Sequence, residues 1–509
     1  MNKPERRRQL IAALEEQAAV WVTQLLQGQP YDPPPGPQAA QVLDWLATTL
    51  LPRLRQTPQE ITHLLRGLAG EYVPSGPAGA PSRGRPEVLP TGRNFYGVDV
   101  RAIPTEMAWQ VGQQAAQAVI ERYTQDHGEY PRTLALSIWG TATIRNGGED
   151  FAEALALLGV RPVWAGPSRR VVDWEILPLR YLGRPRVDVT LRVSGFFRDS
   201  FPHLLDLFSQ AVRAVAALEE SPQDNPLVAQ IPHDQQVLQD QGLPPDHAYI
   251  RVFGPKPGSY GAGLQGLIAA GNWETPADLA TAFLNWSAYA YTDSEWGTVA
   301  PAALRQRLQT TQIVLHNQDN REHDILDSDD YYQFQGGLTV AIRALTGQTP
   351  VVYHGDHARP TAIRIRTLQE ELRRVYRTRV VNPKWIQAMM RHGYKGAFEL
   401  AATVDYFFAY DATTGLGDDG IYAGIARAYL LDPAVRRFLT QTNPWALWSM
   451  AERLWEAHQR GLWQQADPAL LDQLRQLIHT TEALIEAGAP IVQSSPAVPE
   501  DCRVCPDNR

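Results

Sequence analysis

Cysteine is nearly absent from the sequence, with only Cys502 and Cys505 among 509 residues. Both lie in the tail EDCRVCPDNR, after the stretch SSPAVP, and this composition predicts disorder over residues 491–509. A framework of disulfide bonds is therefore excluded. A single CxxC pair without a second pair is a weak signal for zinc or redox chemistry, so neither cysteine is assigned a function.

Long apolar runs are also missing, since no run approaches the ~20 residues that a membrane-spanning helix needs. The N-terminus MNKPERRRQLIAALEEQAAVWVTQLL begins basic like a signal peptide, but Glu15 and Glu16 interrupt its apolar part. It therefore predicts an amphipathic helix. An excess of positive charge is absent too, because the net charge is −8, which argues against nucleic acid or an anionic membrane as a partner. We expect a cytoplasmic protein.

What remains is an ordinary globular composition, 44% hydrophobic and 20% charged. The distribution of proline, glycine and apolar residues predicts five parts. These are an N-terminal helical segment (1–70), a Pro/Gly-rich loop (71–105) without regular structure, an α/β region (106–365), an α-helical domain (366–490) and the disordered tail (491–509).

Short apolar segments in the α/β region predict strands that alternate with helices. Each of TLALSIW, VDVTLRV, HAYIRVF, QIVLH and PVVYH is followed by a polar, Gly-rich or charged loop. Alternation of this kind indicates parallel βαβ units. Ligands bind beyond the carboxyl ends of such strands, so the five loops are expected to converge on a cleft. The fold class is therefore α/β, followed by a helical domain in which Asn382-Pro383 and Asn443-Pro444 predict helix starts.

One loop is unusually acidic. The stretch HNQDNREHDILDSDDYY (316–332) holds six carboxylates and two histidines. From composition alone, a solvated acidic loop is the favoured interpretation, and a site for a cation or for proton transfer is the alternative. The stretch is not an EF-hand, because no glycine occupies the sixth loop position. A Walker A motif is likewise absent, since no Gly-Lys-Ser/Thr follows GPKPGSYG.

Several long motifs occur together in one order: VLPTGRNFYGVD, SIWGTATIRNGGED, GRPRVDVTLRVSGFFRDSF, GPKPGSYGAG, NQDNREHDILDSDDYYQFQGG and NPKWIQAMMRHGYKGA. From about residue 60 to 487 the chain resembles the C-terminal part of the large subunit of class I tetrapyrrole chelatases, the CobN/magnesium chelatase family. The resemblance implies a tetrapyrrole-binding subunit of an ATP-dependent chelatase, with ATP hydrolysed by AAA+ and integrin-like partner subunits. Family members are usually more than twice as long, so a separate N-terminal head chain is a further expected partner.

The fuller motif REHDILDSDDYYQFQGG resembles the cobalt branch of the family. The resemblance therefore implies insertion of Co²⁺ into hydrogenobyrinic acid a,c-diamide in cobalamin biosynthesis. Insertion of Mg²⁺ into protoporphyrin IX is the alternative. A tetrapyrrole carrier or sensor without catalysis, and chelation by this chain without ATP, are further alternatives.

Metal insertion requires removal of water from the ion, removal of protons from the pyrrolic nitrogens, and a firm hold on the ring. Carboxylates and imidazoles serve the first two needs. Together with the resemblance, this predicts Glu322 and His323 as proton acceptor and metal-delivery pair, supported by Asp319 and Asp327. Asp324 joins Glu322 and His323 as a predicted metal ligand.

Ring-binding residues are predicted from the other motifs, each with a structural alternative. Arginines in these motifs suit the carboxylate rim of the ring, and aromatic residues suit its face. The alternatives are a loop clamp for Arg93, an internal Arg198–Asp199 pair, core packing for Trp139 and a tight turn in place of a flexible flap at 258–263. The histidines of YHGDHARP are interpreted as unrelated to metal binding. The predicted substrate-binding residues are Arg93, Asn94, Tyr96, Trp139, Arg145, Arg198, Tyr260 and Tyr331.

Overall fold

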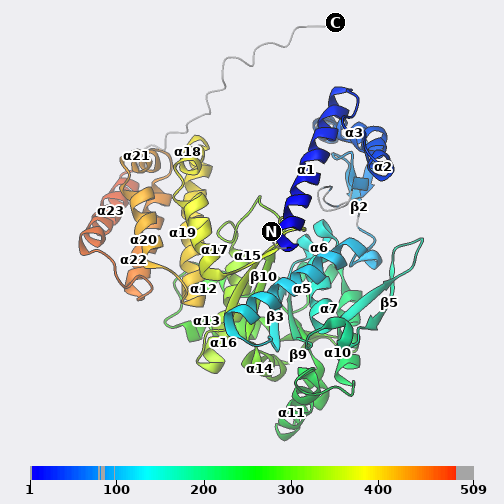
Figure 1. Ribbon diagram of the computed structural model, residues 1–509. Helices are drawn as coiled ribbons and strands as arrows, with labels where there is room; N and C mark the ends of the chain where they lie inside the picture. The colour runs from blue at the N-terminus through cyan, green and yellow to red at the C-terminus, as the bar shows by residue number, and fades with distance from the viewer. Residues whose placement is uncertain (1–2, 78, 80, 82–85, 97, 489–509) are drawn as a thin grey trace. The chain divides into compact units, whose positions relative to one another are not determined.

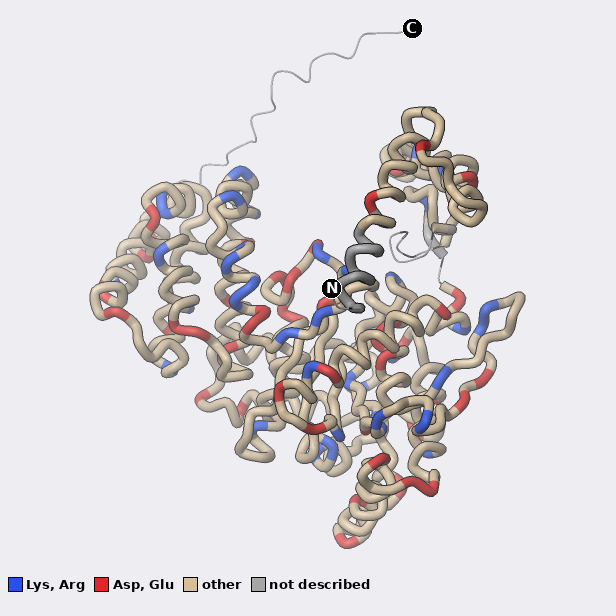
Figure 2. Tube along the Cα trace, in the orientation of Figure 1, with Lys and Arg blue, Asp and Glu red and all other residues tan. Residues whose placement is uncertain are grey.

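The computed structural model describes residues 3–77, 79, 81, 86–96 and 98–488 of the chain (Figure 1). Backbone contacts divide it into two compact units: residues 1–100 with 144–146, and residues 101–143 with 147–509. Lys and Arg are interspersed with Asp and Glu along the described parts of both units (Figure 2). No helix of the described residues is long and apolar enough to cross a membrane.

The first unit is mainly helical. Its prolines mark helix boundaries, since Pro37 stands in the first turn of a helix, where its missing N–H has no partner to lose. The Pro/Gly-rich stretch, for which no regular structure was predicted, contains a short parallel strand pair in which Ser75 lies opposite Asn94. The elements are α1 (Lys3–Gln27), α2 (Pro37–Trp45), a π-helical turn (Leu46–Leu50), α3 (Leu51–Leu54), α4 (Gln59–Leu68), β1 (Ser75–Pro77), a 3₁₀ turn (Pro86–Val88), β2 (Asn94–Tyr96) and a second 3₁₀ turn (Val100–Ala102), which reaches into the second unit.

An eight-stranded sheet organises the second unit, in the order β12-β11-β10-β3-β6-β7-β8-β9. The five central strands, β11 to β7 in this order, are parallel, and the outer strands are antiparallel. These five are the strands that the sequence predicts, so the prediction of parallel βαβ units is confirmed. The strands are β3 (Thr133–Ile138), β6 (Asp188–Val193), β7 (Val252–Gly254), β8 (Tyr289–Tyr291), β9 (Trp296–Val299), β10 (Ile313–Gln318), β11 (Val351–Asp356) and β12 (Arg364–Thr367).

Helices connect the strands. Strands β3, β6 and β10 are buried along nearly their whole length, as continuous apolar runs in a parallel sheet require. Ala135, Val314 and Val352 belong to a core shared with helices α13, α14, α16 and the C-terminal helices. The helices are α5 (Glu106–His127), α6 (Gly140–Asn146), α7 (Glu149–Leu158), α8 (Leu179–Leu182), α9 (Gly195–Ser200), α10 (Pro202–Ala216), α11 (Pro226–Asp240), α12 (Gln265–Ala269), α13 (Pro276–Ser287), α14 (Pro301–Thr310), α15 (Asp329–Tyr331) and α16 (Gly337–Thr346).

The smaller elements of this region are a hairpin and two turns. Strands β4 (Val160–Trp164) and β5 (Val171–Ile176) pair antiparallel, apart from the main sheet. A 3₁₀ turn covers Pro245–Tyr249, and a π-helical turn covers Tyr332–Gly336.

The C-terminal region is helical, as predicted. Asn382 and Asn443 cap helices, because their side chains accept hydrogen bonds from the amides of Lys384 and Ala446. The helices are α17 (Leu368–Val375), α18 (Pro383–Arg391), α19 (Gly393–Thr414), α20 (Asp419–Ile425), α21 (Pro433–Thr442), α22 (Pro444–Gln459) and α23 (Pro468–Glu486), with π-helical turns at Tyr376–Val380 and Ala426–Leu431.

Candidate active site

Near the carboxyl ends of β10 and β11, the side chains of the motif HNQD (316–319) fall into two groups, one on each face of the sheet. Successive residues of a strand point to opposite faces of the sheet. His316 therefore points to the same face as its register neighbour His354, whereas Asn317 points to the opposite face. The two faces are described below as the histidine face and the acid face.

Asn317 is the centre of the acid face. Its Nδ2 donates to Asp150 Oδ1 at 3.1 Å and to Glu153 Oε2 at 2.5 Å, and both carboxylates belong to helix α7. Gly355 leaves room for this arrangement, since a Cβ there would overlap Asn317 Oδ1. An amide thus bridges two buried carboxylates at the edge of the sheet.

The carboxyl groups of the acid face lie close together and are buried. Burial raises the pKa of Asp150 to about 6 and that of Glu153 to about 7, with neighbouring carboxylates adding to the effect. Burial alone would lower the pKa of His357, but Glu149, whose Oε2 lies 3.8 Å from its Nδ1, and the other two acids outweigh burial and raise it. The acid face can therefore accept and release protons near neutral pH.

The acids of this group were not predicted. The stretch GTATIRNGGED, which follows the first predicted strand, was expected to form a polar loop, whereas the chain forms α6, reverses at Gly147 and Gly148, and begins α7 with the two acids Glu149 and Asp150. Both glycines have positive φ, of 80° and 94°, which other residues rarely adopt. The adjacent Gly-Gly was the available signal for a helix end followed by a new helix.

The histidine face holds two imidazoles that are withdrawn from solvent. His316 contacts Tyr331 and His354, with ring centroids 5.0 and 6.0 Å away. Trp139 lies edge-on to both His316 and Tyr331. Burial lowers the pKa of His316 to about 3 and also lowers the pKa of His354, so both rings are neutral at pH 7.

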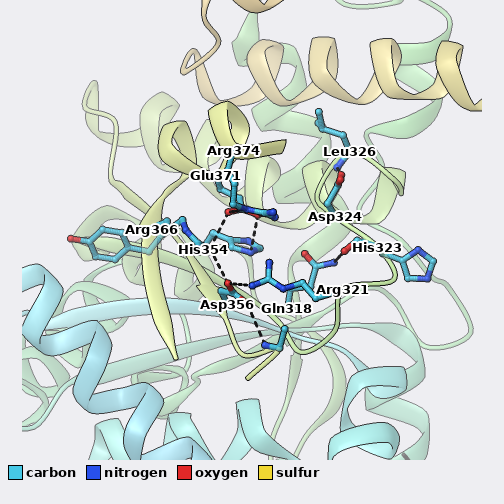
Figure 3. A network of polar contacts seen from close by, with 12 residues as sticks. Gln318, Arg321, His323, Asp324, Leu326, His354, Asp356, Arg366, Glu371 and Arg374 are labelled. Carbon is cyan, nitrogen blue, oxygen red and sulfur yellow. Dashed lines mark hydrogen bonds and ion pairs between the residues drawn. The ribbon is translucent and has the colours of Figure 1, made fainter. Parts of the chain in front are cut away.

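A network of ion pairs surrounds His354 (Figure 3). Its Nε2 lies 3.5 Å from Oε1 of the fully buried Glu371. Arg366 bridges Glu371 and Asp356, at 3.2 and 3.0 Å, and Arg321 binds Asp356 from the loop. The acidic partners of this network are therefore neutralised by arginines, and the imidazole remains the uncharged member.

The structure does not gather the predicted metal ligands into one set. Glu322 and His323 are exposed, and Figure 3 shows the His323 ring pointing away from the network. Asp324 instead accepts from both Nε and Nη2 of Arg379, at 2.5 and 2.8 Å. Within the described residues, no group of three or more His, Cys, Asp or Glu side chains is arranged to hold a metal ion.

The predicted supporting carboxylates, Asp319 and Asp327, have different partners. Asp319 is buried directly after β10 and accepts from Asn320 Nδ2 at 3.0 Å. Its charge raises the pKa of Asp150, so it acts on the acid face. Asp327 accepts the amide of Asp324 and lies 3.3 Å from Arg379. Asp327 therefore fastens the loop, and a catalytic role for it stays a prediction.

Two predicted ring-binding residues of the second unit come together, namely Trp139 and Tyr331. Both are half-buried beside His316, and Trp139 also packs on Phe334, with ring centroids 4.3 Å apart. Trp139 thus packs partly in the core, which is the structural alternative to ring binding. Stacking of Tyr331 on a ring stays a prediction.

Arg198 forms the predicted internal pair with Asp199, at 2.6 and 2.8 Å. Its remaining Nη1 donates to the carbonyls of Pro255, Lys256 and Ser259, so the buried guanidinium fastens the loop that was predicted as a flexible flap. Tyr260 at the tip is exposed, and its hydroxyl donates to Asp199 at 3.0 Å. Roles for Arg198 and Tyr260 in ring binding stay predictions.

The other predicted ring-binding residues belong to the first unit. Arg93 donates to the carbonyls of Pro90 and Val88, which is the loop-clamp arrangement. The side-chain amide of Asn94 donates to the carbonyl of Val73, and Arg145 lies in α6. The side chain of Tyr96 and the residues Cys502 and Cys505 lie outside the described part of the chain.

A cavity of about 340 Å³ lies beside the 329–332 segment, among helices α12, α19 and α22. No sequence pattern indicated it. Tyr394, Phe398 and Trp445, all at least half-exposed, form aromatic walls, and Asp405 and Arg453 form an ion pair at 2.8 Å within it. Such a lining suits a flat, partly apolar ligand.

Comparisons with known proteins agree with this architecture. A profile described as CobN/Magnesium Chelatase matches residues 1–470. The chain belongs to the CobN/magnesium chelatase family. A relative named aerobic cobaltochelatase subunit CobN, from Pseudomonas aeruginosa, is 57% identical over 458 residues, which are 89% of this chain and 36% of the relative.

Other members of the family are similar to different degrees. A solved structure of the catalytic subunit of cobaltochelatase from Mycobacterium tuberculosis is 49% identical, with a TM-score of 0.83 over 94% of this chain and 40% of that one. A magnesium-chelatase subunit of Chlorobaculum parvum is 32% identical over 442 residues, 86% of this chain and 34% of the relative. The chain thus spans about a third to two fifths of the length of these family members.

Proposed function

We propose that this chain is the tetrapyrrole-binding, metal-inserting part of an ATP-dependent cobaltochelatase. Its substrates are Co²⁺ and hydrogenobyrinic acid a,c-diamide, in cobalamin biosynthesis. The observation that carries the proposal is the buried acid face at the carboxyl edge of the parallel sheet, which offers proton acceptors in a chain of this family.

Proton removal is the step that the acid face supports. Metal insertion drives protons off the pyrrolic nitrogens, and a base works best when its pKa is near the working pH. Asp150 and Glu153, with pKa values of about 6 and 7, meet this condition. Asn317 holds both carboxylates in place and His357 supplies a partner that can take a proton onward.

Metal capture belongs to the exposed loop in this proposal. Glu322 and His323 lie at the solvent side of the 319–328 segment, where a hydrated ion arrives. They meet the ion first, while Asp319 connects the loop to the acid face. Asp324 and Asp327 form ion pairs with Arg379, and these pairs hold the loop in place.

Ring binding is proposed for Trp139 and Tyr331, which offer aromatic surface next to the histidine face. Tyr260 and Arg198 are proposed for the rim on the second unit. The rim residues proposed from the first unit are Arg93, Asn94, Tyr96 and Arg145.

The proposal includes partners that supply energy. AAA+ ATPase and integrin-like subunits hydrolyse ATP, which this chain does not bind, and a separate N-terminal head chain completes the complex. The complex works in the cytoplasm without nucleic acid.

Insertion of Mg²⁺ into protoporphyrin IX is the less favoured alternative. The relatives named as magnesium-chelatase subunits are 32–34% identical to this chain, compared with 57% and 53% for two named cobaltochelatase subunit CobN. A carrier without catalysis is disfavoured because it has no need for buried proton acceptors.

An insertion assay tests the proposal. Purified chain is mixed with Co²⁺, hydrogenobyrinic acid a,c-diamide, the AAA+ ATPase and integrin-like subunits and the head chain, and cobalt incorporation is followed by absorbance. We expect incorporation only with ATP and all partners present. Incorporation without ATP would favour the ATP-independent alternative, and binding of the ring without incorporation under any condition would favour a carrier.

A further inference from the structure

His316 and His354 form a pair of imidazoles for which the fold gives no structural reason. They are register neighbours on two parallel strands and point to the same face. Their ring centroids are 6.0 Å apart, with 35° between the planes. The residues are 0% and 2% exposed, so bulk water does not satisfy their nitrogens.

Three of the four ring nitrogens lack a hydrogen-bond partner among the described residues: both nitrogens of His316 and Nδ1 of His354. An unsatisfied buried polar atom destabilises the fold, so such groups call for an explanation. Leucine at either position would fill the space without this cost. The orphaned nitrogens therefore point to a ligand that accepts lone pairs.

The fourth nitrogen has the partner that metal-binding histidines use. His354 Nε2 faces Glu371 Oε1 at 3.5 Å, and Arg366 and Arg374 hold that carboxylate in place (Figure 3). A metal-ligating histidine usually directs its second nitrogen to a carboxylate, which fixes the ring orientation. His354 is thus oriented with Nδ1 free.

The spacing of the rings fits one shared ion. A metal bound to an imidazole nitrogen at about 2.1 Å lies about 3.2 Å from the ring centroid. Two rings on one ion are at most about 6.4 Å apart, when they lie on opposite sides of it, so the observed 6.0 Å admits a shared ion with the two imidazoles nearly opposite each other.

We propose that His316 and His354 form a two-imidazole waiting site that holds the substrate cation, a borderline first-row ion such as Co²⁺, before it enters the ring. The inference rests on the proposed function and adds an internal ion position to it. Two protein ligands hold the ion loosely enough for the ring nitrogens to displace them, whereas three or four would retain it.

This site also gives a basis for choosing the metal. Imidazole suits cobalt and its neighbours, whereas Mg²⁺ prefers oxygen ligands and keeps its water. Two imidazole nitrogens that the ion meets after the 319–328 segment and before the tetrapyrrole therefore select Co²⁺ over Mg²⁺.

A Co²⁺ titration of the full 509-residue chain, without ring or partners, tests the site. Visible absorbance of the bound ion is followed for the wild type, His316→Leu and His354→Gln. We expect each variant to lower Co²⁺ affinity at least tenfold and excess Mg²⁺ not to compete. The matched control is His233→Gln, which removes an exposed imidazole from α11 and leaves affinity unchanged. Thermal unfolding of each variant checks that it is folded.

Several outcomes would overturn the inference. They are no Co²⁺ binding by the wild type, unchanged affinity in the folded variants, or loss of affinity in His323→Gln alone. If either variant fails to fold, X-ray absorption of Co²⁺ on the wild type decides, with two imidazole nitrogens at about 2.1 Å expected and an oxygen-only shell contradictory. A parallel titration with hydrogenobyrinic acid a,c-diamide separates the two proposals, because failure to bind the ring refutes the proposed function itself.

Discussion

The surroundings of Glu153 disfavour the ionised form of its carboxyl group. It is fully buried on α7, and the folded chain holds its proton more tightly than the unfolded chain does. A raised pKa of this kind contributes stability below about pH 4.5, the ordinary value, and loses it as the pH rises through about 7. A buried carboxylate that destabilises the fold at neutral pH is typical of a site kept for function.

Replacing this carboxylate should stabilise the protein in alkaline buffer. In Glu153→Gln the amide oxygen still accepts from Asn317, but the group no longer ionises. We expect the free energy of unfolding at pH 8 to rise by roughly 1–3 kcal/mol, with little change at pH 5. Denaturant unfolding at both pH values measures this.

The exposed Glu322→Gln serves as control, with no change expected at either pH. An equal loss of stability for Glu153→Gln at both pH values would show that Glu153 is held ionised by its neighbours, contrary to this account. Cobalt insertion by the same variant should fall at least tenfold, since a proton acceptor is removed.

Strand alternation explains why the sequence indicated the carboxyl edge of the sheet but not the division of its side chains between two faces. The five parallel strands and the C-terminal helices follow from local apolar patterns, and the sequence predicted them correctly. The acid face depends on contacts across long distances in the chain, since Asn317 and Glu153 are 164 residues apart. No local pattern reports such a pairing. The acidity of residues 316–332 therefore drew the prediction to the exposed loop rather than to α7.

Gly355 should be intolerant of a side chain. A Cβ there would overlap Asn317 Oδ1, so Gly355→Ala must displace the amide that bridges Asp150 and Glu153. We expect a loss of about 1–3 kcal/mol in unfolding free energy and a clear drop in insertion rate. Chemical denaturation and the insertion assay measure the two effects.

The comparison is Gly266→Ala in α12, where nothing lies within 4 Å of the added methyl group. That variant should be as stable as the wild type or slightly more so. Normal stability and activity in Gly355→Ala would contradict the arrangement of the acid face.

Aromatic residues beside the histidine face should contribute more to ring binding than those of the helical cavity. We expect Tyr331→Ala to weaken binding of hydrogenobyrinic acid a,c-diamide roughly three- to tenfold, the loss that one stacking contact represents. Trp445→Ala, at the wall of the cavity among α12, α19 and α22, should bind normally. Fluorescence titration distinguishes the two, and the reverse order would move the ring site to the cavity.

At the scale of the whole molecule, the chain is a two-unit portion of a much longer family architecture. It spans 36% and 40% of the length of two cobaltochelatase subunits yet contains the sheet, the acid face and the histidine face. Ring choice and metal choice are therefore proposed to belong to this portion. Energy from ATP is proposed to come from its partners.

Ring preference tests this account most directly. Purified chain is titrated with hydrogenobyrinic acid a,c-diamide and, separately, with protoporphyrin IX, and binding is followed by absorbance. We expect tighter binding of the corrin precursor. A clear preference for the porphyrin would contradict the cobalt assignment, and failure to bind either ring would contradict the proposed function as a whole.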